Sequence, residues 1–214
     1  MAEYKELKGG KVKNYTTNPD NPYAGQVWFN ETAGELRIRK STKTSAWASG
    51  GNLNTARGYM GNAGTQTAAL AFGGDVPPNT AATEQYDGSS WTEVNDMNSA
   101  RQAFGSNGTQ TSALAYAGLS PPEVAITESW NGSNWTEVAD MSTARRLFKG
   151  AGADNTNALA FAGYTGTANT ANTEKWDGSS WTEVNNLNTA RRNTTGIGAS
   201  NTAALVVGGY TTTV

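Results

Sequence analysis

Four arginines recur along the sequence at nearly constant spacing and could act as anion-binding groups. Successive arginines are 44, 44 and 46 residues apart. A guanidinium group binds carboxylates through paired hydrogen bonds, so a ring of them along a channel would bind an anion such as a carboxylated glycan. The channel-lining candidates are Arg57, Arg101, Arg145 and Arg191. Their regular repetition favours a structural alternative, in which each arginine pairs with backbone carbonyl groups or with a glutamate of the series Glu84, Glu128 and Glu174.

The chain lacks the residues that many familiar catalytic mechanisms require, because it contains no cysteine and no histidine. Disulfides, thiolate zinc sites, Cys or His nucleophiles and Ser-His-Asp arrangements are therefore excluded. A carboxylate pair could still hydrolyse glycosidic bonds, but no pair of Asp or Glu residues stands out from the repeat pattern strongly enough to be nominated. We expect no catalytic residue, no metal and no cofactor, and hence a non-enzymatic function.

Aromatic residues recur with the same period as the arginines. They could stack on sugar rings, as they do in lectins, or pack between repeated sheets. Because they recur in every repeat, we favour packing. The residues concerned are Tyr86, Trp91, Trp130, Trp135, Trp176 and Trp181.

The elements that position these residues are short β-strands. Apolar residues are 36% and charged residues 16% of the chain, and Thr, Asn, Ser and 25 glycines fill much of the remainder, which favours strands and turns. Each repeat predicts a strand after the arginine, an apolar strand such as Ala69–Gly74, and a hairpin such as Thr83–Val94. The hairpin turn contains Asx-Gly, as in Asp87-Gly88, where Gly tolerates positive φ and Asx bonds the backbone. Four strands per repeat of about 45 residues describe a propeller blade.

A Gly-Gly or Ala-Gly pair ends the apolar strand of each repeat, and an aromatic residue and a Trp five positions later follow in the hairpin. This pattern resembles the kelch motif over residues 51–214, in repeats 51–96, 97–140, 141–186 and a partial repeat 187–214. Ala117 and Ala162 replace the first glycine, and two repeats carry Trp where kelch repeats usually have Tyr. The resemblance implies an all-β fold, a small kelch-like β-propeller.

Closure of the ring requires strands from both ends of the chain. The last repeat stops after two strands, at Ala204–Tyr210, while Glu35–Arg39 and Trp47 lie where its missing strands would. We expect about four blades, the last shared between N-terminal and C-terminal strands. Gly25–Asn30 predicts a further strand, which either makes that blade five-stranded or pairs elsewhere, for example with a neighbouring subunit.

The N-terminal segment carries a second resemblance. Asn18–Arg37 followed by Ser45–Trp47 resembles a hairpin motif of phage tail-fibre and virion structural proteins, and Gly61–Gly74 and Gly105–Tyr116 resemble repeats of marine and cyanobacterial phages. The resemblance implies a tailed-bacteriophage virion protein, assembled in the host cytoplasm. Residues 1–24 would form an extended arm for virion attachment, and residues 25–50 a β-hairpin with closing strands.

Charge divides the chain into a basic start and an acidic body. Residues 1–50 hold 8 Lys/Arg against 5 Asp/Glu, whereas residues 51–214 hold 8 against 13. This asymmetry fits a docking arm, or ordinary solvated charge. The net charge of −2 argues against broad nucleic-acid binding. No apolar run is long enough for a signal peptide or a membrane span, so we expect no membrane insertion.

Variation between repeats concentrates in the connection between the second and third strands. Variable loops on one rim of a rigid framework are where recognition is usually housed, and paired prolines would stiffen two of them. The candidate ligand-binding residues are Asp75, Pro77, Pro78, Asn79, Pro121, Pro122, Glu123, Tyr164 and Asn169. We expect a tail-fibre, tail-associated or capsid-decoration protein, present in multiple copies or as a homo-oligomer. It would contact other phage structural proteins through its arm and a host-surface glycan through its loops. The alternative is a lectin-like propeller without a virion role.

Overall fold

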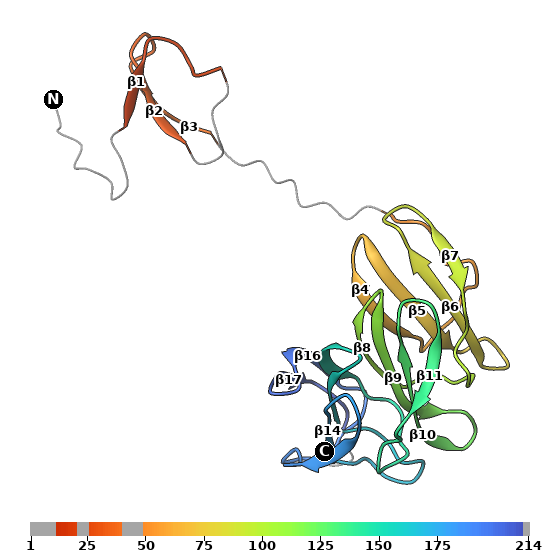
Figure 1. Ribbon diagram of the computed structural model, residues 1–214. Helices are drawn as coiled ribbons and strands as arrows, with labels where there is room; N and C mark the ends of the chain where they lie inside the picture. Colours follow the sequence, from red (N-terminus) through yellow and green to blue (C-terminus); the bar gives the residue numbers. More distant parts are fainter. Residues whose placement is uncertain (1–11, 21–25, 40–48, 212–214) are drawn as a thin grey trace. The chain divides into compact units, whose positions relative to one another are not determined.

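The computed structural model describes residues 12–20, 26–39 and 49–211 of the chain (Figure 1). All regular secondary structure in these ranges is β-strand, in 17 strands and five sheets, which confirms the predicted all-β class. The chain divides into two compact units, Met1–Ser49 and Gly50–Val214.

The N-terminal unit contains a three-stranded sheet of order β1-β2-β3, with β1 at Lys13–Tyr15, β2 at Val27–Asn30 and β3 at Glu35–Ile38. β2 and β3 form the predicted hairpin, and β1 pairs with β2 in parallel. The Asn18 side chain accepts hydrogen bonds from Trp28 Nε1 at 3.2 Å and Asn30 Nδ2 at 3.0 Å. The segment 12–20, which we expected in an extended arm, thus contributes strand β1 to this sheet and the side chain of Asn18 to the hydrogen bonding of β2. Residues 1–11 of that arm lie outside the described residues.

The second unit consists of the four predicted repeats. Repeats 1 to 3 each form one four-stranded antiparallel sheet, as predicted, and repeat 4 forms a two-stranded one. Repeat 1 contains β4 (Gly61–Thr65), β5 (Ala68–Gly74), β6 (Thr80–Tyr86) and β7 (Trp91–Val94); repeat 2 contains β8 (Gly105–Thr109), β9 (Ser112–Leu119), β10 (Glu123–Trp130) and β11 (Trp135–Val138). Repeat 3 contains β12 (Gly150–Asp154), β13 (Asn157–Phe161), β14 (Thr173–Trp176) and β15 (Trp181–Val184); repeat 4 contains β16 (Thr195–Ser200) and β17 (Ala203–Val207).

The outer hairpin of each complete repeat turns at the predicted Asx-Gly pair. In β6–β7, Asp87 Oδ1 accepts hydrogen bonds from the backbone N–H groups of Ser89 and Ser90, both at 2.8 Å. Gly88 has φ +97°, a conformation that disfavours side chains. Asn131 and Asp177 make the same backbone contacts in repeats 2 and 3. The local sequence therefore determines this turn in the way we expected.

The hydrophobic core lies between successive sheets. The indole of Trp135 in β11 lies 4.8 Å from the ring of Phe72 in repeat 1, and its Nε1 donates to Thr83 Oγ1 at 3.1 Å. One repeat later, Trp181 lies 5.0 Å from the ring of Tyr116 and donates to Thr127 Oγ1 at 3.0 Å. The recurring tryptophans of β11 and β15 thus pack between repeats, as we favoured, and do not form a sugar platform.

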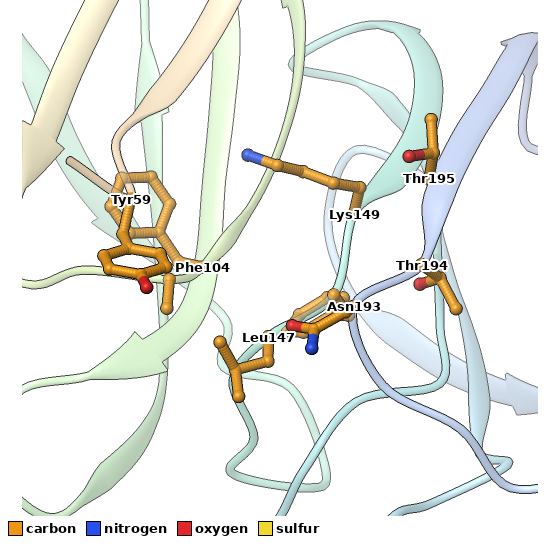
Figure 2. Close-up of a pocket in the computed structure, with 9 residues that line it drawn as sticks. Tyr59, Phe104, Leu147, Lys149, Asn193, Thr194 and Thr195 are labelled. Carbon is orange, nitrogen blue, oxygen red and sulfur yellow. The ribbon is translucent and has the colours of Figure 1, made fainter. Parts of the chain in front are cut away.

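The first strands of the repeats contact each other in series, β4 with β8, β8 with β12 and β12 with β16. The residues just before these strands form a hub at which the four repeats meet. One non-glycine residue per repeat has positive φ there, and backbone N–H groups link these residues: Ala103 to Tyr59 O at 2.8 Å, Leu147 to Ala103 O at 2.8 Å, and Asn193 to Leu147 O at 2.6 Å. They surround a pocket, the hub pocket, shown in Figure 2.

Repeat 4 has no third or fourth strand among the described residues. β17 pairs only with β16 there, and β3 pairs only with β2. The pairing that we predicted between Glu35–Arg39 and Ala204–Val207 is therefore not present in the described strands, because β3 forms its ladder within the N-terminal sheet. Trp47, the other predicted closing residue, lies outside the described residues.

Candidate functional site

The strongest candidate site is the series of connections between the second and third strands of repeats 1 to 3. We call residues 75–79, 120–123 and 162–172, together with Arg146, Arg192 and Tyr210, the loop rim. Each of these loops contacts the repeat that follows it. The three variable loops therefore form one continuous row.

Asn79 makes the first junction of the loop rim. Its Nδ2 donates to Leu119 O in repeat 2 at 2.9 Å, and its Oδ1 accepts from Gln102 Nε2 at 3.1 Å. Both polar atoms of the amide are thus engaged between repeats. Asp75 is half-buried, and its backbone pairs with Gly58 across an antiparallel bridge.

Glu123 makes the second junction. Its carboxylate lies 3.0 Å from Arg146 Nε of repeat 3, in an ion pair that is partly exposed. Glu123 also approaches the loop of repeat 3 at Gly166, where an added Cβ would lie 2.6 Å from Oε2 and where φ is +90°. A side chain at position 166 would therefore displace the Glu123 carboxylate and strain the backbone.

A stack of alternating arginines and tyrosines makes the third junction. The Arg192 guanidinium lies 4.8 Å from the ring centroids of both Tyr164 and Tyr210, and Arg146 lies 5.5 Å from that of Tyr164. Asn169 braces this stack, because its Nδ2 donates to Tyr210 O at 3.1 Å and its Oδ1 accepts from Arg192 Nη1 at 3.3 Å. Tyr210 is 53% exposed, so the stack is open to solvent.

The paired prolines are the most exposed of the predicted loop residues. Pro77, Pro78, Pro121 and Pro122 are all exposed, and the peptide bond within each pair is cis. The structure thus brings the predicted residues together as neighbours along the loop rim, with the prolines outermost and Asn79, Glu123 and Asn169 bonded between repeats. These loops offer rigid exposed apolar surface beside guanidinium and phenol groups.

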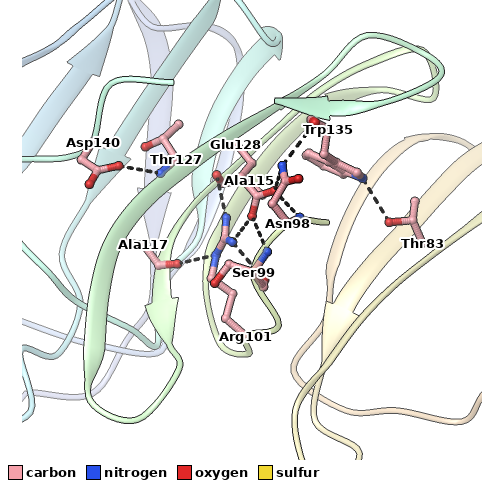
Figure 3. Close-up of polar contacts among 10 residues, drawn as sticks. All are labelled: Thr83, Asn98, Ser99, Arg101, Ala115, Ala117, Thr127, Glu128, Trp135 and Asp140. Atoms are coloured by element: carbon pink, nitrogen blue, oxygen red, sulfur yellow. Dashed lines mark hydrogen bonds and ion pairs between the residues drawn. The ribbon is translucent and has the colours of Figure 1, made fainter. Parts of the chain in front are cut away.

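The predicted channel arginines occupy a different environment. In repeat 2 the Arg101 guanidinium forms an ion pair with Glu128, and it donates to Ala117 O at 3.0 Å and Ala115 O at 3.2 Å (Figure 3). Both side chains are fully buried. Arg57 pairs with Glu84 at 3.0 Å and Arg145 with Glu174 at 3.1 Å, with side chains at most 2% exposed. These three arginines are therefore bound within their own repeats, as in the structural alternative, and none presents its charge to solvent.

Each of these glutamates also binds the segment that leads into its repeat. The other carboxylate oxygen accepts a backbone N–H at 2.7 Å, from Asn54, Asn98 and Ser142 in the three repeats. We call this arrangement the Arg–Glu clamp. Burial lowers the pKa of Arg101 and the Glu128 charge opposes that shift, so the ion pair offsets part of the cost of burying the guanidinium.

Arg191 differs because repeat 4 has no third strand among the described residues. It donates instead to Gly208 O at 3.0 Å and to Thr189 O at 3.3 Å, and it is half-exposed. No carboxylate forms an ion pair with it in the described part of the chain.

Sequence reasoning missed Arg146, Arg192 and Tyr210 of the loop rim. A signal was present: repeats 3 and 4 read Ala-Arg-Arg where repeats 1 and 2 read Ala-Arg-Gly and Ala-Arg-Gln. The second arginine stands beside the clamp arginine but points to the loops.

Within residues 12–20, 26–39 and 49–211, no group of three or more His, Cys, Asp or Glu residues could hold a metal ion. The same ranges contain no helix with the length and apolarity to cross a membrane.

No protein-family model matches this chain, and no curated protein matches it either. The kelch-like and phage-like resemblances therefore rest on the residues of the repeats and of the N-terminal hairpin.

Proposed function

We propose that this chain is a non-enzymatic structural protein of a tailed-phage virion, a tail-fibre, tail-associated or capsid-decoration protein that displays its loop rim for assembly contacts or host-surface recognition. The observation that carries the proposal is the contrast between repeats. The clamps, turns and tryptophan contacts recur almost unchanged, whereas the exposed loops differ and still join in one row. A constant framework with variable exposed loops is typical of recognition proteins.

The proposed architecture is a small kelch-like propeller of about four blades, with N-terminal strands completing the blade begun by β16 and β17. Two features of repeat 4 support it. Leu205 and Val207 are 61% and 46% exposed, although their counterparts in repeats 1 and 2 are fully buried. β17 also offers an unpaired strand edge among the described strands, and such edges are usually covered.

The N-terminal unit supports attachment to a larger particle. It forms its own sheet, its described strands carry exposed apolar side chains such as Leu36 and Ile38, and the segment 1–50 is basic overall. We propose that the first residues anchor the chain to other capsid or tail proteins, in multiple copies. Assembly would take place in the host cytoplasm, without membrane insertion and without nucleic-acid binding.

Incorporation into particles tests this proposal. A host culture infected with the phage that encodes the chain should yield purified particles containing it, whereas a chain lacking residues 1–11 should fold and stay outside the particles. As a matched control, replacing the exposed Thr92 of β7 with Ser should leave incorporation unchanged, because this residue lies outside both the N-terminal unit and the loop rim. Absence of the wild-type chain from purified particles would refute the virion role.

A lectin-like module without a virion role is the second candidate, favoured by the Tyr164–Arg192–Tyr210 stack. Exposed tyrosine rings stack on sugars, and guanidinium groups bind sugar carboxylates. A glycan array tests it: binding should be lost in Tyr210→Ala and Arg192→Met and kept in Tyr15→Ala, a tyrosine of the N-terminal sheet. Glycan binding by a chain that never enters particles would favour this candidate over the first.

A further inference from the structure

Repeats 3 and 4 each carry one residue that repeats 1 and 2 lack. A glycine at the start of the first strand, or one residue into it, follows the repeated arginine by four positions in repeats 1 and 2 and by five in repeats 3 and 4. The additional residues are Lys149 and Thr195. Both line the hub pocket, which has a volume of about 210 Å³ (Figure 2). The two insertions therefore meet at one place in the fold.

Lys149 carries a charge that no described carboxylate neutralises. Its Nζ donates to Met60 O in repeat 1 at 3.4 Å, and it forms no ion pair within the described residues. Burial lowers the pKa of Lys149, and no neighbouring negative charge opposes that shift. An ammonium group has three donors, so two remain for the contents of the pocket. Lys149 is half-buried, and a partly desolvated charge without a carboxylate partner is costly, which makes this lysine unusual for a structural residue.

Thr194 adds a second unsatisfied polar group to the same wall. It is 3% exposed, and its Oγ1 has no hydrogen-bond partner. Repeats 1 to 3 have Met60, Phe104 and Phe148 at this position, all apolar. In Figure 2 the hydroxyl oxygens of Thr194 and Thr195 lie on the side of those side chains that faces the stem of Lys149, while the Lys149 ammonium group extends away from them toward repeat 1. Of the residues at this repeat position that line the pocket, Phe104 and Phe148 are apolar and only Thr194 can form hydrogen bonds.

The rest of the pocket is mostly apolar and small. Ala103, Phe104, Leu147 and Phe148 line it, with Tyr59 and Asn193 at its exposed edge. One cation suits a singly charged ligand better than a phosphate, whose second charge would stay unpaired. The volume lies below the ~300 Å³ at which pockets for drug-sized ligands begin, so the ligand must be short.

We propose that the hub pocket binds a small carboxylate, with its charge paired to Lys149, a hydrogen bond from Thr194 and its apolar stem against Phe104 and Leu147. The site uses no residue of the loop rim. Its occupancy is therefore independent of the virion role.

Titration of the whole chain with sodium propionate at constant ionic strength, followed by NMR, tests the proposal. We expect saturable shifts at residues 147–149 and 193–195, and none with propionamide, the neutral analogue. Lys149→Met should weaken propionate binding at least tenfold, and Thr194→Val several-fold. Lys175→Met, which removes a lysine from β14 outside the pocket, should bind as the wild type does.

Three results would overturn the proposal: no saturable binding of propionate, equal binding by Lys149→Met, or tighter binding of inorganic phosphate than of propionate. Thermal unfolding of Lys149→Met without ligand distinguishes a ligand-binding role of Lys149 from a purely structural role. Removing a half-buried charge that has no carboxylate partner should leave the melting temperature of Lys149→Met unchanged or higher. A large drop with unchanged propionate binding would mean that Lys149 serves to hold Met60.

Discussion

Repeat 2 and repeat 4 begin with nearly the same residues and fold into the same first two strands, yet their environments differ. Leu114 is fully buried in repeat 2, while its counterpart Leu205 is 61% exposed. Arg101 is clamped by Glu128, while Arg191 is half-exposed and binds only carbonyl groups. The inner strand pair therefore does not create the core. Burial comes from the two outer strands and from the next repeat packed on them.

The largest expected effect comes from breaking a complete clamp. Glu128→Ala leaves Arg101 buried without its carboxylate, and we expect the free energy of unfolding to fall by about 3–5 kcal/mol. Chemical denaturation measures this loss. Arg191→Met is the matched control and should cost less than about 1 kcal/mol, because its side chain is half-exposed. Equal losses in the two variants would remove the distinction between the repeats.

Leucine truncation sharpens the same comparison. Leu114→Ala empties a fully buried site, and we expect a loss of about 2–5 kcal/mol. The proposed completion of repeat 4 also buries Leu205, so Leu205→Ala should cost about 2 kcal/mol in the whole chain. A loss near zero for Leu205→Ala would show that its side chain stays in solvent.

The indole hydrogen bonds between repeats have a smaller effect. Thr127→Val removes the acceptor of Trp181 Nε1 and leaves a buried donor unpaired, for a loss of about 1–2 kcal/mol. Thr173 is the equivalent residue of repeat 3, but no tryptophan donates to it among the described residues, and its Oγ1 reaches Ala171 O at 3.4 Å. Thermal unfolding should therefore show a smaller shift for Thr173→Val. A reversed order would mean that the indole bond is not what Thr127 contributes.

The smallest effect concerns pH and the hairpin turns. Hydrogen bonds from Ser179 and Ser180 lower the pKa of Asp177 to about 2. Because the folded pKa lies below the unfolded value of about 3.9, its stabilisation is present above pH 4 and is lost as the pH falls towards 2. Asp177→Asn should remove that dependence at little cost near pH 7, because Asn131 makes the same turn in repeat 2. An NMR titration giving Asp177 a pKa near 4 would contradict this.

Local chemistry made much of the framework predictable. Asx-Gly turns, the recurring tryptophans and the Arg and Glu series each repeat often enough to predict the four strands and the clamps. The hub was not predictable, because Tyr59, Ala103 and Leu147 adopt positive φ without glycine. The inserted Lys149 shifts later positions by one residue, which is visible only when strand positions are compared with arginine positions. The Arg192 stack depends on the distance between neighbouring repeats, and no local pattern encodes that distance.

Amide hydrogen exchange along β17 in the whole chain tests the completed fourth repeat most directly. In an edge strand of an antiparallel pair, every second amide points away from its partner and exchanges quickly. The proposed architecture requires N-terminal strands on this edge, and it predicts uninterrupted protection from Ala204 to Val207, comparable with that of β13. Fast exchange at alternate residues of β17 would contradict the account.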